Sequence, residues 1–264
     1  MTIAVLKSVQ INQTITFLYN QAFAVTTRVL LQTALNNYYT ENLSPNMSFP
    51  SAHRDLQTAV STQSQIFAAR VYTTDMTLLP NLTVIDVDYP LPDSLNPTGI
   101  PRPPDGSDNT AIAGALFGPV QIPDSPGTYA LSLTIPIMNT NDSSHLSLLG
   151  WMSTVFTASG IQRAVNDRTG MGQTGQVLVV ARNQSRYEVI IPPARTPRIH
   201  NQEFKRGQYP AVDLAFDNHS SPGYLINTHD AGGYPVSVGY HVFHFFKKLI
   251  DCSYQTYGLL HGRY

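Results

Sequence analysis

The sequence predicts an α+β protein in which one long N-terminal helix accompanies two lobes, each a curved antiparallel sheet flanked by helices. Two patterns support this prediction. Apolar residues from Ile11 onward recur every three or four positions, which is the spacing of one face of an α-helix. Residues 150–181 then read as strand, helix, glycine turn and strand, which indicates a joint between two sheets. With 264 residues, the chain can supply two lobes of ordinary domain size.

These patterns divide the chain into four segments. Residues 1–50 are predicted to form the long helix and a polar break, and residues 51–157 a first lobe. Residues 158–175 form a connecting helix with a glycine turn, and residues 176–264 a second lobe. The last twenty residues fit this scheme least, and whether they complete the second sheet stays open.

The N-terminal helix is predicted from six apolar positions: Ile11, Ile15, Leu18, Ala22, Val25 and Val29. No proline precedes Pro45, so we expect one unbroken helix from about residue 10 to residue 40, roughly 45 Å long at 1.5 Å per residue. Residues 11–39 contain one charged side chain, Arg28, so a second copy of the helix could approach without burying ions. We therefore expect a homodimer along this helix, with Ile15, Leu18, Ala22 and Val25 as positions for crosslinking.

The first lobe is predicted to contain a helix at residues 55–65 and five strands. Residues 90–108 hold six prolines and are predicted to be a long loop, either a lid over the sheet or an insertion. The predicted strands are 66–72, 82–88, 111–120, 129–138 and 148–156, of which 82–88 alternates weakly and could instead be a surface extension.

The second lobe repeats this scheme in a shorter form. A loop rich in proline and arginine is expected at 192–207, and residues 230–233 form a hairpin turn. Its predicted strands are 176–182, 186–191, 223–228 and 235–241.

The composition excludes some classes of partner. Charged residues make up only 12% of the chain and the net charge is −1, so no basic field attracts a nucleic acid. The one cysteine, Cys252, cannot form an intrachain disulfide, so the core alone must stabilise the chain. No apolar run approaches the roughly 18 residues of a membrane span, and the first ten residues do not resemble a signal peptide.

The sequence has seven Asn-x-Ser/Thr sequons; Asn42 has a proline after its serine, and the other six suggest a glycosylated surface of the secretory pathway. The alternative is that a chain rich in Asn, Ser and Thr generates sequons by chance. The candidate glycosylation sites are Asn12, Asn46, Asn81, Asn141, Asn183 and Asn218.

The sequence predicts no cofactor, no metal site and no catalytic residue. Residues 170–175 spell the dinucleotide-binding fingerprint, but a helix precedes these glycines and a strand follows, the reverse of the order that a pyrophosphate site requires. His241 and His244 lie on opposite sides of a predicted strand, whereas a metal needs three or four converging ligands. Serines and Cys252 lie in no nucleophile motif, so we expect that this segment is not an enzyme.

The strand, helix, glycine turn and strand at residues 150–181 resemble the segment that joins the two halves of double Cache sensor domains. The residues of this segment and their spacing are most similar to those in the extracellular sensors of fungal transmembrane hybrid histidine kinases, of the osmosensor type. The resemblance covers roughly residues 11–240. It implies a spine helix beside two PAS-like lobes, with residues 51–157 distal and 176–264 proximal to the membrane.

This resemblance also implies a function. The chain would be the extracellular sensory domain of a signalling kinase at the plasma membrane, with the membrane spans and the kinase outside this sequence. It would pass on the presence of a small ligand in the distal lobe, or an osmotic state.

The residues implied to contact a ligand are Arg70, Tyr72, Asp75 and Tyr129, on or beside the strands that line the distal lobe in such domains. Each could instead pack its side chain locally. The stretch 109–120 lacks the Arg, Trp and Tyr of amino-acid-sensing Cache domains, which argues against an amino acid as the ligand.

A secreted glycosidase or carbohydrate-binding protein is the alternative, because the sequons and the many tyrosines also suit it. The parent gene would decide between the two: apolar spans on both sides of this segment favour the sensor, and a signal peptide alone favours the alternative.

Overall fold

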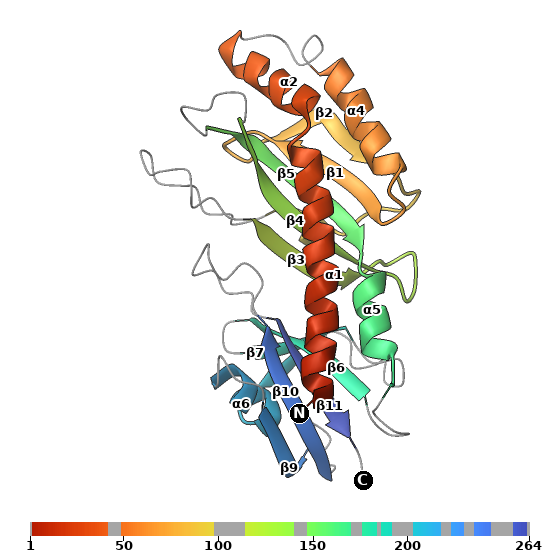
Figure 1. Ribbon diagram of the computed structural model, residues 1–264, viewed down its shortest axis with the longest axis vertical. Helices are drawn as coiled ribbons and strands as arrows, with labels where there is room; N and C mark the ends of the chain where they lie inside the picture. The colour runs from red at the N-terminus through yellow and green to blue at the C-terminus, as the bar shows by residue number, and fades with distance from the viewer. Residues whose placement is uncertain are drawn as a thin grey trace. The chain divides into compact units, whose positions relative to one another are not determined.

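The computed structural model has two compact units, which are described separately (Figure 1). Unit 2 comprises Phe17–Ala158, and unit 1 comprises the first sixteen residues and most of the chain from Ser159 onward. The structure describes residues 2–41, 49–97, 114–139, 147–169, 176–183, 186–191, 203–217, 223–229, 235–243 and 256–262.

The N-terminal helix is long, but it is not continuous to residue 40 as predicted. Helix α1 spans Thr2–Thr26 and helix α2 spans Val29–Thr40. Between them, Arg28 has an extended backbone, with φ −68° and ψ 127°. The prediction of one unbroken helix is therefore wrong, although the sequence contains no proline here.

A tertiary contact explains this break. The Arg28 guanidinium donates two hydrogen bonds to Asp55, from Nε to Oδ2 at 2.6 Å and from Nη2 to Oδ1 at 2.5 Å. Asp55 lies on α4 (Pro50–Ser61), so this two-pronged pair ties the junction to another helix. The buried Gln32 amide also donates to the carbonyl of Thr26 at the end of α1, at 3.2 Å. The Thr26 carbonyl at the end of α1 thus accepts a side-chain hydrogen bond where the helix no longer supplies a backbone donor.

The predicted apolar face of α1 is buried inside the chain. Ile11, Ile15, Leu18, Ala22 and Val25 are each at most 4% exposed. These positions pack inside the chain, so a dimer through α1 would have to use other positions than the ones expected. The apolar residues of α1 that do face outward are Leu6, Val9, Phe17 and Phe23.

Unit 2 is built on a five-stranded antiparallel sheet, in the order β2-β1-β5-β4-β3. Helix α4 contacts β1 and β2, and α2 contacts β5. The second strand begins earlier than predicted, at Leu78. The strands are β1 (Ile66–Tyr72), β2 (Leu78–Ile85), β3 (Ala115–Gln121), β4 (Tyr129–Met138) and β5 (Leu148–Thr157).

The two faces of this sheet differ in chemistry. One face is apolar and lies under the helices; it carries Ala69, Val71, Leu131, Leu133 and Met152, all buried. Paired strands place their partnered residues on the same face. The opposite face, here named the Arg70 face, carries Ala68, Arg70, Tyr72, Ala130, Ser132, Thr134, Trp151, Ser153 and Val155.

The Arg70 face is partly covered by the short 3-10 helix η1 (Asp93–Leu95). Leu95 is fully buried in a cluster with Ala68, Ala130, Val155 and Ile122. The described part of the predicted loop, up to residue 97, therefore packs on the sheet. The rest of that loop lies outside the described residues.

Unit 1 contains a six-stranded antiparallel sheet in the order β8-β7-β6-β11-β10-β9. The last strand, β11, pairs with both β6 and β10, so the final residues of the chain complete the middle of the sheet. The strands are β6 (Gln176–Asn183), β7 (Arg186–Ile191), β8 (Glu203–Lys205), β9 (Gly223–His229), β10 (Pro235–Phe243) and β11 (Thr256–Gly262).

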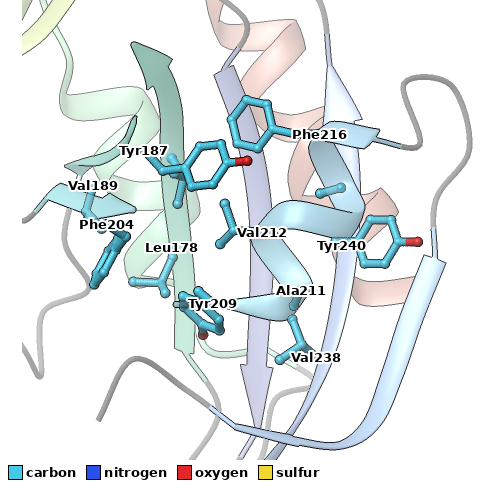
Figure 2. Packing of buried hydrophobic residues seen from close by; sticks show 12 residues of the cluster. Leu178, Tyr187, Val189, Phe204, Tyr209, Ala211, Val212, Phe216, Val238 and Tyr240 are labelled. Atoms are coloured by element: carbon cyan, nitrogen blue, oxygen red, sulfur yellow. The ribbon is translucent and has the colours of Figure 1, made fainter. Parts of the chain in front are cut away.

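One face of this sheet packs against helix α6 (Pro210–Asp217), as Figure 2 shows. Phe216 is fully buried and stacks on Tyr187, with ring centroids 4.5 Å apart. Phe204 and Tyr209 meet edge to face at 6.1 Å. Aromatic rings thus supply much of the apolar area in this core.

A buried lysine links α1 to the end of helix α5 (Ser159–Asn166) within unit 1. Lys7 is 2% exposed, and its Nζ lies 2.6 Å from Oδ2 of Asp167. The backbone N–H and the hydroxyl of Thr169 also donate to Oδ1 of Asp167, at 3.0 and 2.7 Å. These hydrogen bonds hold the pKa of Asp167 well below its usual range. The bond from Lys7 has the largest effect, and those from Thr169 follow.

This ion pair predicts a pH dependence of stability. Because the pKa of Asp167 is lower in the folded state, its contribution is complete above the unfolded value of about 4 and is lost as the pH falls toward the folded value. We expect Asp167→Asn to melt several degrees lower at pH 7, because it leaves the Lys7 ammonium buried and unpaired, and to flatten the decline below pH 4.

Thermal unfolding between pH 2 and pH 7 measures this effect. Asp217→Asn is the matched control, because Asp217 pairs with Arg206 on the exposed surface, where ion pairs contribute little. Equal melting temperatures for Asp167→Asn and Asp217→Asn at pH 7 would contradict the prediction.

Candidate ligand-binding site

The candidate site is a polar row on the Arg70 face of unit 2. Arg70 on β1 is paired with Ser153 on β5, and Ser153 is paired with Thr134 on β4. Because neighbouring strands lie about 4.8 Å apart, the three residues cross the sheet within about 10 Å. The pairing register thus places Arg70 beside two residues that lie 64 or more positions further along the chain.

Two further rows flank this one. Tyr72 and Trp151 are paired in the next row and are both buried. On the other side, the Ser132 hydroxyl lies 3.1 Å from the Ser153 hydroxyl, and both side chains are fully buried. The site therefore combines a cation, several hydroxyls and two large aromatic rings.

Arg70 bonds to two neutral groups, the side-chain amide of Asn96 and the phenol of Tyr72. Its Nη1 donates to the amide oxygen of Asn96, just after η1, and the Asn96 amide nitrogen lies 3.3 Å from Oδ1 of Asp93. Burial raises the pKa of the Tyr72 phenol, and the neighbouring Arg70 guanidinium opposes that rise. The phenol therefore stays protonated at neutral pH and can donate a hydrogen bond.

The hydroxyl of Thr134 has no hydrogen-bond partner among the described residues, although the side chain is fully buried. Buried polar groups are nearly always paired, so each exception calls for an explanation. Thr154 on β5 is also buried and unpartnered, but it lies on the opposite, helix-covered face.

The structure brings together two of the four predicted site residues. Arg70 and Tyr72 share the Arg70 face. Tyr129 begins β4 on the opposite face, with Leu131 and Leu133, and is buried there. Asp75 lies exposed in the turn between β1 and β2, where the hydroxyls of Thr73 and Thr77 donate to it.

Sequence reasoning missed Asn96, Ser132, Thr134, Trp151 and Ser153. One local signal was present. Ser132 and Thr134 alternate with the apolar residues of β4, so both lie on the side of the strand away from the helices. That signal alone does not connect these hydroxyls with Arg70, because the connection depends on strand pairing.

Two of the predicted glycosylation sites lie exposed in the structure, Asn12 on α1 and Asn81 on β2. Asn183 ends β6. The remaining three, Asn46, Asn141 and Asn218, lie outside the described residues.

Within the described ranges, no cluster of three or more His, Cys, Asp or Glu side chains could hold a metal ion. None of the described helices is long and apolar enough to cross a membrane.

Solved structures with a similar fold are sensory domains of receptors. The periplasmic sensory domain of the Campylobacter jejuni chemoreceptor Tlp1 matches with a TM-score of 0.56 and 11% identity, over 98% of this chain and 93% of that one. The extracellular domain of the proposed histidine kinase vpHK1S-Z8 matches with a TM-score of 0.56 and 10% identity, over 98% and 92%. The chain therefore has the α+β fold of these sensory domains.

One curated protein is similar in sequence, the osmosensing histidine protein kinase SLN1 of Saccharomyces cerevisiae. The two are 28% identical over 202 residues, which is 72% of this chain. The chain spans 16% of the length of that kinase. No family model matches the sequence.

Proposed function

We propose that this chain is the extracellular sensory domain of a fungal transmembrane histidine kinase, with a double Cache architecture. The observation that carries the proposal is the 28% identity with the osmosensing kinase over most of this chain, in a chain that has a sensory-domain fold. The domain itself performs no catalysis. It changes the activity of a kinase that lies outside this sequence.

The stimulus acts through unit 2, the lobe predicted to lie far from the membrane. The Arg70 face supports this role because it gathers buried hydroxyls and a cation, and Asn96 at the end of η1 bonds to that cation. A ligand that displaces Asn96 from Arg70 would shift η1, which Asn96 follows directly. Such a shift need change the balance between two states by only about 1–3 kcal/mol to alter output.

An extracellular position also implies N-linked glycans. Asn12 and Asn81 are the favoured sites, because both side chains are exposed in the structure. After secretion from a eukaryotic host, intact mass before and after enzymatic deglycosylation measures their occupancy. An unshifted mass would contradict this position.

A chimeric kinase tests the sensory function. This chain replaces the matching segment of the Saccharomyces cerevisiae kinase, and autophosphorylation is measured before and after an osmotic shift. We expect activity to change by about fivefold or more, the lower end of ordinary coupling between sites. The control chimera carries an unrelated folded domain of similar length. Equal responses in both chimeras would overturn the proposal.

We also propose that the domain dimerises along the outward face of α1. Phe17 and Phe23 are each nearly half exposed there, and the one charged side chain of α1, Lys7, is buried. Two copies can therefore pack this face without burying a charge.

Single cysteines test this dimer in the membrane-bound chimera. We expect disulfide crosslinks at Phe17→Cys or Phe23→Cys, because tethering raises the effective concentration of weakly interacting domains. Leu18→Cys is the control and should not crosslink, because Leu18 is buried within the chain. Failure of both outward positions to crosslink would contradict a dimer through α1.

A further inference from the structure

The Arg70 side chain is a half-buried cation that lacks an acidic partner. Within the described residues, no carboxylate oxygen lies within 4.0 Å of its guanidinium. Its partners are instead two neutral groups, the amide oxygen of Asn96 and the phenol of Tyr72. A guanidinium is a fork of donors that fits a carboxylate with two parallel hydrogen bonds, so Asn96 occupies a position that a ligand carboxylate would fill better.

The hydroxyls across the sheet supply the second half of a recognition pattern. Ser132 and Ser153 satisfy one another at 3.1 Å, whereas the Thr134 hydroxyl is fully buried without a partner among the described residues. A buried hydroxyl without a partner costs free energy unless something completes its hydrogen bond. A ligand hydroxyl can both donate to it and accept from it.

The described residues of the Arg70 face disfavour one class of ligand. They carry no carboxylate, and Asp93 of η1 is exposed and lies close to the Asn96 amide. The ammonium of an amino acid would therefore lie beside Arg70 with no anion to neutralise it. A second carboxylate would likewise have no second cation.

We propose that this face binds a small hydroxylated monocarboxylate. Arg70 binds the carboxylate, and Thr134 binds a hydroxyl. This inference rests on the proposed sensory function, because it names the ligand of the same site.

Matched probes test the ligand class by calorimetry on the isolated chain. 2,3-Dihydroxybutanoate and gluconate carry the predicted groups. Threonine replaces one hydroxyl of the first by an ammonium, and glucitol lacks the carboxylate of the second. We expect at least one hydroxy acid to bind saturably, and threonine and glucitol to bind at least about tenfold more weakly, the discrimination expected when a charged hydrogen bond is lost.

Variants locate the site. Arg70→Gln is expected to abolish binding, and Thr134→Val to weaken it about tenfold. Thr154→Val is the matched control, because it removes a buried unpartnered hydroxyl from the same sheet but on the opposite face. Both valine variants should melt at or above the wild-type temperature, since neither loses a hydrogen bond, so only binding separates them.

Two results would overturn the inference: neither hydroxy acid binds, or Thr154→Val weakens binding as much as Thr134→Val does. Tighter binding of threonine than of dihydroxybutanoate would also overturn it. The chimera separates this failure from failure of the sensory function. A chimera that responds to an osmotic shift while no hydroxy acid binds refutes the ligand class alone, and binding without any change in kinase output refutes the function alone.

Discussion

Replacing Gly150 with alanine is expected to destabilise unit 2 by about 3 kcal/mol, at the upper end of the cost of local backbone strain. Gly150 lies in β5 with φ +156°, and a Cβ added there would lie 2.4 Å from the carbonyl oxygen of Tyr72. That oxygen belongs to the neighbouring strand β1, whose Tyr72 is paired with Trp151. Because the obstacle is backbone, it cannot move without disturbing the β1–β5 pairing that aligns Arg70 with Ser153.

Urea denaturation of the whole chain measures this loss. Gly127→Ala is the matched control, because Gly127 also has a positive φ, +84°, but an added Cβ meets nothing within 4 Å. It should therefore cost only the conformational penalty of about 1–2 kcal/mol. Equal losses of stability in the two variants would show that the Tyr72 carbonyl oxygen is no obstacle to a side chain at residue 150.

Truncating Phe216 to alanine is expected to destabilise unit 1 by about 3–5 kcal/mol, as deletion of a buried aromatic side chain usually does. Phe216 is fully buried on α6 and stacks on Tyr187 of β7, with the ring planes 21° apart (Figure 2). Alanine would leave a cavity between the helix and the sheet, and α6 would lose its largest contact there.

Amide hydrogen exchange locates this effect in the chain. We expect the amides of β6 and β7 to exchange faster, because opening of the sheet becomes less costly. Ile226→Ala on β9 is the control, since Ile226 is 64% exposed and its truncation should change stability by no more than about 0.5 kcal/mol. Unchanged protection of β6 and β7 in Phe216→Ala would show that α6 does not stabilise the sheet.

Local patterns were sufficient for most of the elements. The strands β1, β4 and β5 begin and end within about one residue of the predicted bounds, and helix α5 lies within the predicted connecting helix. These elements have clear periods of two or 3.6, and apolar faces that any packed sheet or helix must bury. The pair Arg70 and Tyr72 could be placed on one face for the same reason, because positions i and i+2 of a strand share a side.

The break at Arg28 shows where local patterns fail. The residues around it have ordinary helical spacing and no proline. The β-branched run at residues 25–27 favours a helix only weakly, and the hydroxyls of Thr26 and Thr27 donate to carbonyls three residues earlier. Asp55, which binds Arg28, lies 27 positions further along the chain. A helix end fixed by such a distant partner is not visible in local propensity.

Periodicity along single segments is enough to predict the helices, the strands, the α+β class and the shared face of Arg70 and Tyr72. It does not predict the order of the strands, the position of β11 in the middle of its sheet, or the row that joins Arg70 with Ser153 and Thr134. Strand order and register depend on hydrogen bonds between segments far apart in the chain, and many pairings satisfy the same local alternation. Packing of the whole chain selects one of them.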